Sequence, residues 1–372
     1  MQLCMKSTIE QCSTEVAPTT EQCLIKDTRH QGKTMLMYTP RQGAPIQAAL
    51  ACAVLTDSGE TNKLLKKHNV GNVVSCIACH DVPSIPRQAP QTSKFADAVW
   101  ACSQVAITPH IHYRLVLDIV GKQLYEFASS HQLVTAVRDA LIAHKDAYHN
   151  AGVLHQDLSV GNIVIHDGKG ILIDWDLSNL INIKGARQVT RMGTLQFISA
   201  DLIANRKTKH DVEDDLESSF YVVLWTALLC TKTHLTIPAR SLLMKQVFEV
   251  AELEGVVFDT KSPFLISRSR FGSDVFVNRK PLDKLVLALA EFFAIRYKWV
   301  TQEEQNAYDQ GCVCMEEAKL SATEMVLITN LWKANPAYKL KMYMEILKLH
   351  KLHDKIIEIY DSHLRLDGWP HQ

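Results

Sequence analysis

A short stretch of the chain carries residues with the types and the spacing that phosphoryl transfer requires. Residues 155–176 read HQDLSVGNIVIHDGKGILIDWD, in which Asp157 follows His155 and Asn162 lies further along the same loop. Two short apolar runs, NIVI and GILI, then lead to Asp174. Transfer of a phosphoryl group from ATP needs one carboxylate at the acceptor hydroxyl, and an amide and a second carboxylate on magnesium. The three residues Asp157, Asn162 and Asp174 fit these roles, and the apolar runs predict a hairpin beneath them.

The bulk composition excludes several classes of protein. The chain has 372 residues, with 40 basic and 40 acidic side chains, so nothing indicates a nucleic-acid or membrane surface. The first residues, MQLCMKSTIEQCSTEV, lack the apolar region of a secretory signal. The longest apolar run, residues 219–230, is too short to span a bilayer and predicts a buried helix. We therefore expect a protein of the cytosol or the nucleus.

The cysteines permit more than one interpretation. Ten of them in 372 residues are too sparse for a disulfide scaffold. The sequence CIACH at residues 76–80 matches the attachment motif of c-type haem, and Cys76 and Cys79 could also hold zinc together with distant histidines. Against haem, the sequence shows no convincing axial ligand for the iron. Against zinc, no second C-x-x-C or H-x-x-x-H follows. Ordinary cysteines on a buried strand are the preferred interpretation.

Predicted strands gather early in the chain and predicted helices late. Residues 22–27 read as a strand carrying Lys26, residues 72–79 and 112–121 as further strands, and residues 47–68 as a helix with Glu60. Three prolines mark residues 81–98 as an exposed insertion.

The later part of the chain has helical periodicity. Residues 131–152 place Leu133, Val137, Ala140, Leu141 and His144 on one face, with Gly152 as the C-terminal stop. Further helices are predicted over 214–230, 281–299 and 321–364. Together these elements predict an α+β fold, with a small sheet lobe and a larger helical lobe.

Four segments resemble the fungal-type protein kinase family: AGVLHQDLSVGNIVI, LIDWDLS, RMGTLQFISADLI and HDVEDDLESSFYVVLW. The likeness covers about residues 110–235. It implies a two-lobed protein-kinase-like fold, with an N-terminal lobe over 1–118 and a helical C-terminal lobe over 119–372. Within the second lobe it implies a catalytic loop at 155–162, a metal-binding DWD at 174–176 and an activation segment ending at about 203.

The resemblance also implies roles for single residues. Asp157 would be the catalytic base, while Asn162 and Asp174 would hold Mg²⁺ on the phosphates of ATP. Lys26 matches the strand lysine that contacts the phosphates, and Glu60 is the candidate for its helix partner.

Other positions would support the site structurally. His155 would pack beneath the loop, Gly193 and Thr194 would lie towards the end of the activation segment, and Asp215 would anchor the loop from below. The acids Asp211, Asp214 and Asp215 could be mistaken for a metal site, but carboxylates at a helix start are the commoner explanation.

The chain departs from the general kinase pattern at several points. No glycine precedes Gly32, so no Gly-rich loop leads into Lys26, and we expect weakly held ATP. A truncated lobe and a degenerate kinase both remain open as explanations. Gln156 and Ser159 stand where many kinases have Arg and Lys. Asp176 removes the flexible glycine that usually follows the metal-binding aspartate.

Three functions fit these motifs. The first is a serine/threonine protein kinase that uses ATP and Mg²⁺, favoured because GTLQFISADL resembles a peptide-docking segment. The second is a small-molecule phosphotransferase of the aminoglycoside or choline type, which shares the His-x-Asp-x4-Asn pattern. The third is a pseudokinase scaffold, supported by the missing glycines but opposed by the intact Asp157, Asn162 and Asp174.

Overall fold

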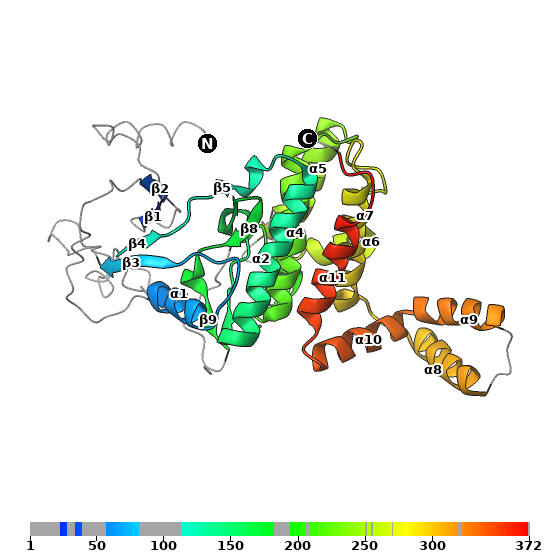
Figure 1. Cartoon of the computed structure of the whole chain (residues 1–372). Helices are drawn as coiled ribbons and strands as arrows, with labels where there is room; N and C mark the ends of the chain where they lie inside the picture. The colour runs from blue at the N-terminus through cyan, green and yellow to red at the C-terminus, as the bar shows by residue number, and fades with distance from the viewer. Residues whose placement is uncertain are drawn as a thin grey trace. The chain divides into compact units, whose positions relative to one another are not determined.

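The structure is a computed structural model of the chain (Figure 1). It describes residues 23–27, 34–38, 57–81, 113–181, 194–205, 208–249, 251–253, 256–269, 271–317 and 322–370. The chain divides into two compact units. The first comprises Met1–Lys63 and Val74–Val120, and the second comprises Leu64–Val73 and Gly121–Gln372. Most of the predicted insertion, residues 82–98, lies outside the described residues.

The described part of the first unit contains an antiparallel sheet with the strand order β2-β1-β4-β3. Its strands are β1 (Cys23–Asp27), β2 (Thr34–Tyr38), β3 (Cys76–Asp81) and β4 (Tyr113–Leu117). The strands predicted at 22–27, 72–79 and 112–121 are thereby confirmed, although β3 starts and ends later than predicted. Strand β2 was not predicted, because its sequence TMLMY has no polar alternation and its pairing depends on β1. The helix α1 (Asp57–Lys67) lies within the range predicted for a helix.

The two cysteines of CIACH lie on strand β3. A register shift between Cys76 and Ala78 marks a bulge in the pairing of β3 with β4. Both Cys76 and Cys79 are partly buried free thiols. Burial, followed by the nearby Cys79, raises the pKa of Cys76 to about 12, so this thiol stays protonated near neutral pH.

The core of the second unit is built on four helices: α2 (Ser130–Asp146), α4 (Val212–Cys230), α7 (Lys280–Ala294) and α11 (Leu352–Leu364). In Figure 1, α2, α4 and α11 run side by side, and each packs against the other two. Helix α4 is buried along most of its length, as expected for a helix that is apolar on all sides. Among the helices that the structure describes, none has the length and apolarity to cross a membrane.

Helix α2 confirms the predicted helix near residues 131–152. Ser129 caps its N-terminus by accepting the N–H of Gln132, and all five side chains predicted on its apolar face are fully buried. A π-helical turn (Ala147–Ala151) follows α2 and ends at Gly152, which has a φ of 66°. Gly152 therefore stops the helix as predicted, and it does so in the left-handed conformation.

The acidic residues at the start of α4 cap and stabilise the N-terminus of this helix, which is the structural role favoured for them. Asp211 is the N-cap of α4 and forms a capping box with Asp214, and Asp215 lies in the first turn. No group of three His, Cys, Asp or Glu side chains in the described part of the chain is arranged to hold a metal ion.

The C-terminal helices differ from the prediction. The range 321–364 contains three helices, α9 (Ala322–Ala334), α10 (Pro336–Lys348) and α11, instead of one. Asn335 caps α10 directly before Pro336, and His350 has a φ of 53° between α10 and α11. The predicted helix 281–299 corresponds to α7. The remaining helices were not predicted: α3 (Ala200–Ala204), α5 (Ile237–Phe248), α6 (Lys261–Ser267) and α8 (Gln302–Glu317).

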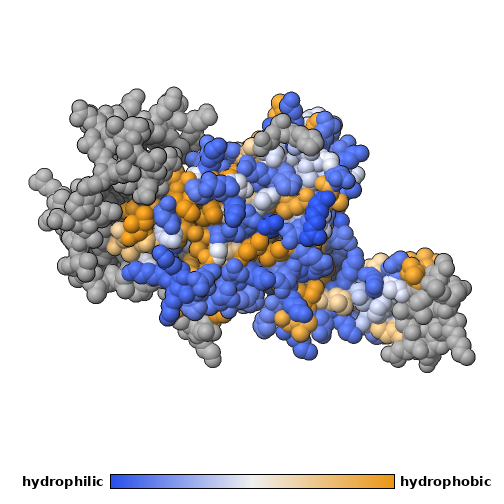
Figure 2. All heavy atoms as spheres, viewed as in Figure 1, coloured by the Kyte–Doolittle hydropathy of each residue, from blue (hydrophilic) through white to orange (hydrophobic). Residues whose placement is uncertain are grey.

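Helices α8, α9 and α10 pack through their own aromatic contacts. The ring of Trp332 stacks on Tyr308, with ring centroids 5.5 Å apart, and also contacts Tyr338. Figure 2 shows hydrophobic residues on the surface of α9. Three of its large apolar side chains are well exposed: Val326, Leu327 and Leu331. This apolar surface is separate from the main core of the unit.

Asp283, in the first turn of α7, gives a testable pH dependence. Its Oδ1 accepts the N–H groups of Val275 and Phe276, while its buried Oδ2 has no hydrogen-bond partner. Burial raises the pKa of Asp283 to about 6. Because the unfolded chain then binds fewer protons than the folded one between pH 4 and 6, this group lowers the stability as the pH rises through that range. We expect Asp283→Asn to raise the free energy of unfolding by about 1–3 kcal/mol at pH 7.5.

Urea unfolding at pH 7.5 and pH 5 measures this effect, with Asp309→Asn on the surface of α8 as the control. The gain from Asp283→Asn should shrink at pH 5, where protonation already removes much of the charge. A variant less stable than the wild type at pH 7.5 contradicts the prediction.

Candidate active site

The predicted hairpin brings the second acidic residue of the motif back to residues 155–162, the predicted catalytic loop. Strands β7 (Ile163–His166) and β8 (Lys169–Leu172) pair antiparallel, and Asp167 and Gly168 in the turn have φ values of 49° and 77°. After β8, the N–H of Ile173 donates to the carbonyl of Asn162 over 2.9 Å. Asp174 therefore follows directly on a residue that is hydrogen-bonded to the end of the catalytic loop.

His155 fastens the start of the loop to the same segment. Its Nδ1 accepts the N–H of Asp157 at 3.2 Å, so its Nε2 is the protonated nitrogen and donates to the carbonyl of Ile173 at 3.1 Å. Burial lowers the pKa of His155, consistent with a neutral ring. Trp175 packs edge-to-face on it, with ring centroids 4.6 Å apart. The structure thus places His155 beneath the loop.

Asp157 lies between Asn162 and Thr194. Its Oδ1 accepts both the N–H and the hydroxyl of Thr194, at 2.8 Å and 2.9 Å. Its Oδ2 accepts from the amide nitrogen of Asn162 at 2.8 Å, and the same nitrogen donates to the backbone carbonyl of Asp157 at 2.6 Å. The Asp157 side chain is buried. Three of the predicted site residues are therefore in direct contact.

Asp215 holds the loop through the backbone of Gln156. Its Oδ2 accepts the N–H of Gln156 at 2.8 Å and the Nε2 of His144 at 2.9 Å, and its Oδ1 accepts from His210 at 2.8 Å. Gln156 has a φ of 66°, a left-handed backbone conformation that costs a non-glycine residue about 1–2 kcal/mol. The buried Asp215 stabilises this conformation directly before Asp157.

The segment that contains Thr194 is held by a buried lysine. Lys261, at the start of α6, is 1% exposed and donates to the carbonyls of Gln196 and Ile198 at 2.8 Å and 2.5 Å. Its ammonium also lies 4.0 Å from the centre of the Tyr221 ring. Burial lowers the pKa of Lys261 to about 7. Two hydrogen bonds thus fix the backbone immediately after Thr194.

An ion-pair network holds the start of α3. Glu217, buried in α4, accepts the N–H of Ala200 at 2.9 Å and pairs with Arg296 at 2.6 Å. Arg296 also pairs with Asp214 at 3.1 Å, and Asp214 in turn accepts the hydroxyl of Ser199 at 2.6 Å. The segment 194–200 is therefore connected at both ends to buried charged groups.

Sequence reasoning missed Lys261, Glu217 and Arg296. A signal existed for Glu217, because it is an acidic residue just before the apolar run of a helix predicted to be buried, and a fully buried carboxylate needs partners. Lys261 and Arg296 lie in stretches with no motif. Their contacts join residues 65 and 79 positions apart, which no local pattern reveals.

Two further predicted site residues, Lys26 and Glu60, lie on β1 and α1. Lys26 is on β1, where it pairs with Met35 of β2 and Leu115 of β4. Glu60 is within α1. For both, the structure describes the backbone only, and Gly193 lies outside the described residues.

The oxygen atoms at the loop fit a magnesium ion. Mg²⁺ prefers carboxylate, amide and water oxygens, usually with only one or two ligands from the protein. Because the nitrogen of Asn162 is committed to Asp157, its Oδ1 is the atom that this amide can offer to a metal. Asp174 adds a carboxylate one residue after Ile173. The donor set therefore suits Mg²⁺ that also binds the phosphates of a nucleotide.

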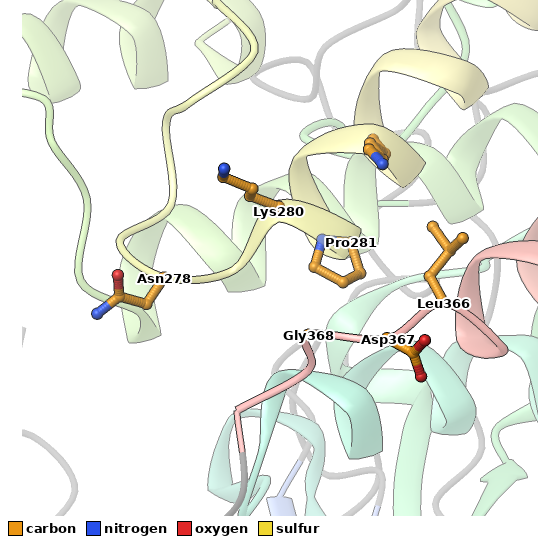
Figure 3. A pocket seen from close by; sticks show the side chains of 7 residues that line it. Asn278, Lys280, Pro281, Leu366, Asp367 and Gly368 are labelled. Atoms are coloured by element: carbon orange, nitrogen blue, oxygen red, sulfur yellow. The ribbon is translucent and has the colours of Figure 1, made fainter.

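A separate cavity lies near the C-terminus of the described chain. Its volume is about 420 Å³. Figure 3 shows six of its lining residues: Asn278, Lys280, Pro281, Leu366, Asp367 and Gly368. None of them belongs to the catalytic loop, the β7–β8 hairpin or the segment after Thr194, so the cavity is no part of the site described above.

The α+β architecture and this loop are those of a kinase-like phosphotransferase, with a helical C-terminal lobe. The sequence profile described as fungal protein kinase matches residues 8–227, more than half of the chain. The chain therefore belongs to the fungal protein kinase family, and the resemblance seen in its motifs is confirmed. No curated protein matches the chain.

Proposed function

We propose that this chain is a serine/threonine protein kinase that transfers the γ-phosphate of ATP to a hydroxyl group of a protein. The observation that carries the proposal is the hydrogen bonding of Asp157 with both Asn162 and Thr194. Thr194 begins the segment proposed to dock a peptide. A small acceptor needs no such segment, so its contact with the base favours a protein over an amino sugar or amino alcohol.

Each residue of the loop has a role in this proposal. Asp157 orients the acceptor hydroxyl and takes its proton, while the hydroxyl oxygen bonds to the γ-phosphorus and the bond to the bridging oxygen of ADP breaks. Asn162 and Asp174 hold Mg²⁺, which neutralises charge on the phosphates. His155 and Asp215 keep the loop in the required geometry.

The sheet lobe would supply the nucleotide contacts. Lys26 is proposed to contact the phosphates of ATP, with Glu60 as its ion-pair partner. The proposed lobes are residues 1–118 and 119–372, with Gly193 and Thr194 in an activation segment that ends at about residue 203.

Thermal unfolding with and without Mg²⁺-ATP tests nucleotide binding. At about 100 times the dissociation constant, bound ligand stabilises the folded state by about 2.7 kcal/mol. We therefore expect saturating Mg²⁺-ATP to raise the melting temperature by about 5 °C. Asp174→Asn should abolish this shift, because it removes the charge that holds the metal without changing the size of the side chain.

Asp167→Asn, in the turn between β7 and β8 with a side chain 87% exposed, is the control and should keep the shift. If Mg²⁺-ATP does not shift the melting temperature of the wild-type chain, both enzyme functions, protein kinase and small-molecule phosphotransferase, are contradicted. A scaffold is then favoured. The acceptor is identified separately by following the labelled γ-phosphate. Transfer to serine or threonine peptides supports the proposal, whereas transfer only to amino sugars or amino alcohols supports a small-molecule phosphotransferase.

A further inference from the structure

A chain of buried hydrogen bonds connects the last helix, α11, to the catalytic loop. His353 in the first turn of α11 is 2% exposed, and its Nε2 lies 2.8 Å from Nδ1 of His144. Nε2 of His144 lies 2.9 Å from Oδ2 of Asp215, which accepts the N–H of Gln156. Three side chains from three helices thus lead in a continuous path to the residue before Asp157.

The ionised acceptor at one end sets the direction of the hydrogen bond next to it. Although burial alone would raise it, the neighbouring His210 and His144 hold the pKa of Asp215 well below its usual value. An ionised carboxylate only accepts, so Nε2 of His144 must donate. Burial, followed by His144, lowers the pKa of His353 well below its usual value, so this ring is neutral. The contact of 2.8 Å between Nε2 of His353 and Nδ1 of His144 is therefore the second hydrogen bond of a ring whose Nε2 is already committed to Asp215.

Helix α11 is fixed in the position that this path requires. Lys145 of α2 pairs with Asp354 at 2.5 Å, and Arg138 of α2 pairs with Asp361 at 2.9 Å. Tyr360, fully buried, donates to the hydroxyl of Ser219 in α4 at 3.3 Å. All three contacts come from α11 residues that follow His353, and they hold the helix against α2 and α4.

We propose that His353 is a positioning residue of the phosphoryl-transfer site, which holds the catalytic loop in place through His144 and Asp215. This inference rests on the proposed function for its kinetic consequence only. Without a partner at Nδ1, the His144 ring loses its fixed orientation and leaves a buried polar atom unpaired. Asp215 then holds Gln156 less firmly, and the left-handed backbone before Asp157 can relax. His353 lies outside residues 8–227, so the region matched by the family does not contain the whole support of the loop.

Two substitutions separate the hydrogen bond from simple packing. His353→Leu has a side chain of similar size but removes the hydrogen-bond partner of His144. His353→Gln carries an amide group that can reach a position close to that of Nε2 and form a hydrogen bond with His144. Ile356→Ala is the control, because it weakens the packing of the same helix through a fully buried residue that has no part in the path.

Three measurements are made on the full chain. Hydrogen exchange measures how often the hydrogen bond of the Gln156 amide opens. ¹⁵N NMR of the imidazole rings shows which nitrogens of His144 carry a proton, and steady-state kinetics give kcat and KM. For His353→Leu we expect exchange at Gln156 to be about tenfold faster or more, and the Nδ1 signal of His144 to shift. We expect kcat to fall about tenfold with little change in KM for ATP, because a displaced catalytic group can cost up to about 100-fold. His353→Gln should restore all three values towards the wild type.

The proposal is overturned if His353→Gln behaves like His353→Leu, or if Ile356→Ala gives the same exchange and NMR changes. It is also overturned if none of the variants alters the hydrogen-exchange rate of the Gln156 amide. A wild-type chain that transfers no phosphate refutes the proposed function alone. In that case the exchange and NMR measurements still decide whether His353 positions the loop.

Discussion

Replacing Asp157 by asparagine is expected to lower kcat for phosphoryl transfer by about 1,000-fold, because general base catalysis contributes about 10²–10⁴-fold. The amide cannot take the proton of the acceptor hydroxyl. It also places an NH₂ group against either Thr194 or Asn162, both of which donate to this side chain in the wild type. KM for ATP should change little, since the proposed nucleotide contacts come from other residues.

Single-turnover transfer of labelled γ-phosphate to a peptide measures this effect. Asp201→Asn in α3 is the matched control, because it removes an acidic group close to the same segment without touching Asp157. The melting temperature of each variant verifies that the fold is retained. If Asp157→Asn keeps its rate within tenfold of the wild type, Asp157 is not the base.

The second large effect is expected at Gly170, in strand β8. A Cβ atom at this position would lie 1.9 Å from the carbonyl oxygen of Ala136 and 2.5 Å from its carbonyl carbon. Both are backbone atoms of α2, so no side chain can move to relieve the overlap. The N–H of Gly170 also donates to Asp139 of α2 over 3.1 Å. Gly170→Ala must therefore separate the hairpin from α2, and we expect it to cost about 3 kcal/mol or more.

Denaturant unfolding of the variant measures this cost. Gly71→Ala is the control, since an added Cβ there meets no atom within 4 Å and Gly71 is not among the residues with positive φ. The control should remain within about 0.5 kcal/mol of the wild type. Equal stabilities of the two variants would show that β8 and α2 are not packed as closely as described.

Local patterns predicted the elements that carry the candidate catalytic residues. The spacing from His155 to Asp174 predicted both the loop and the hairpin, because a short turn between two apolar runs has few other folded forms. The apolar face of α2 and the buried α4 followed from helical periodicity. The resemblance to a family added Asp215, whose contact with the loop joins residues 59 positions apart in the chain.

What could not be predicted depends on contacts between distant residues. Lys261, Arg296 and His353 each lie outside any motif, and their partners are 63 to 209 positions away. The division of 321–364 into three helices depends on Asn335 and His350, whose effects are local but compete with continuous helical periodicity. The roles of these residues can be recognised only when the packing of the helices is known.

The buried amine of Lys261 has a chemical consequence. With a pKa of about 7, it is mostly unprotonated at pH 8, where surface lysines remain charged and react poorly. At 1% exposure, however, no acylating reagent can reach it while it holds Gln196 and Ile198. Covalent labelling at this position must wait for the segment after Thr194 to open. The fold thereby contains an internal reporter, and its labelling rate records how often the proposed docking segment leaves its place.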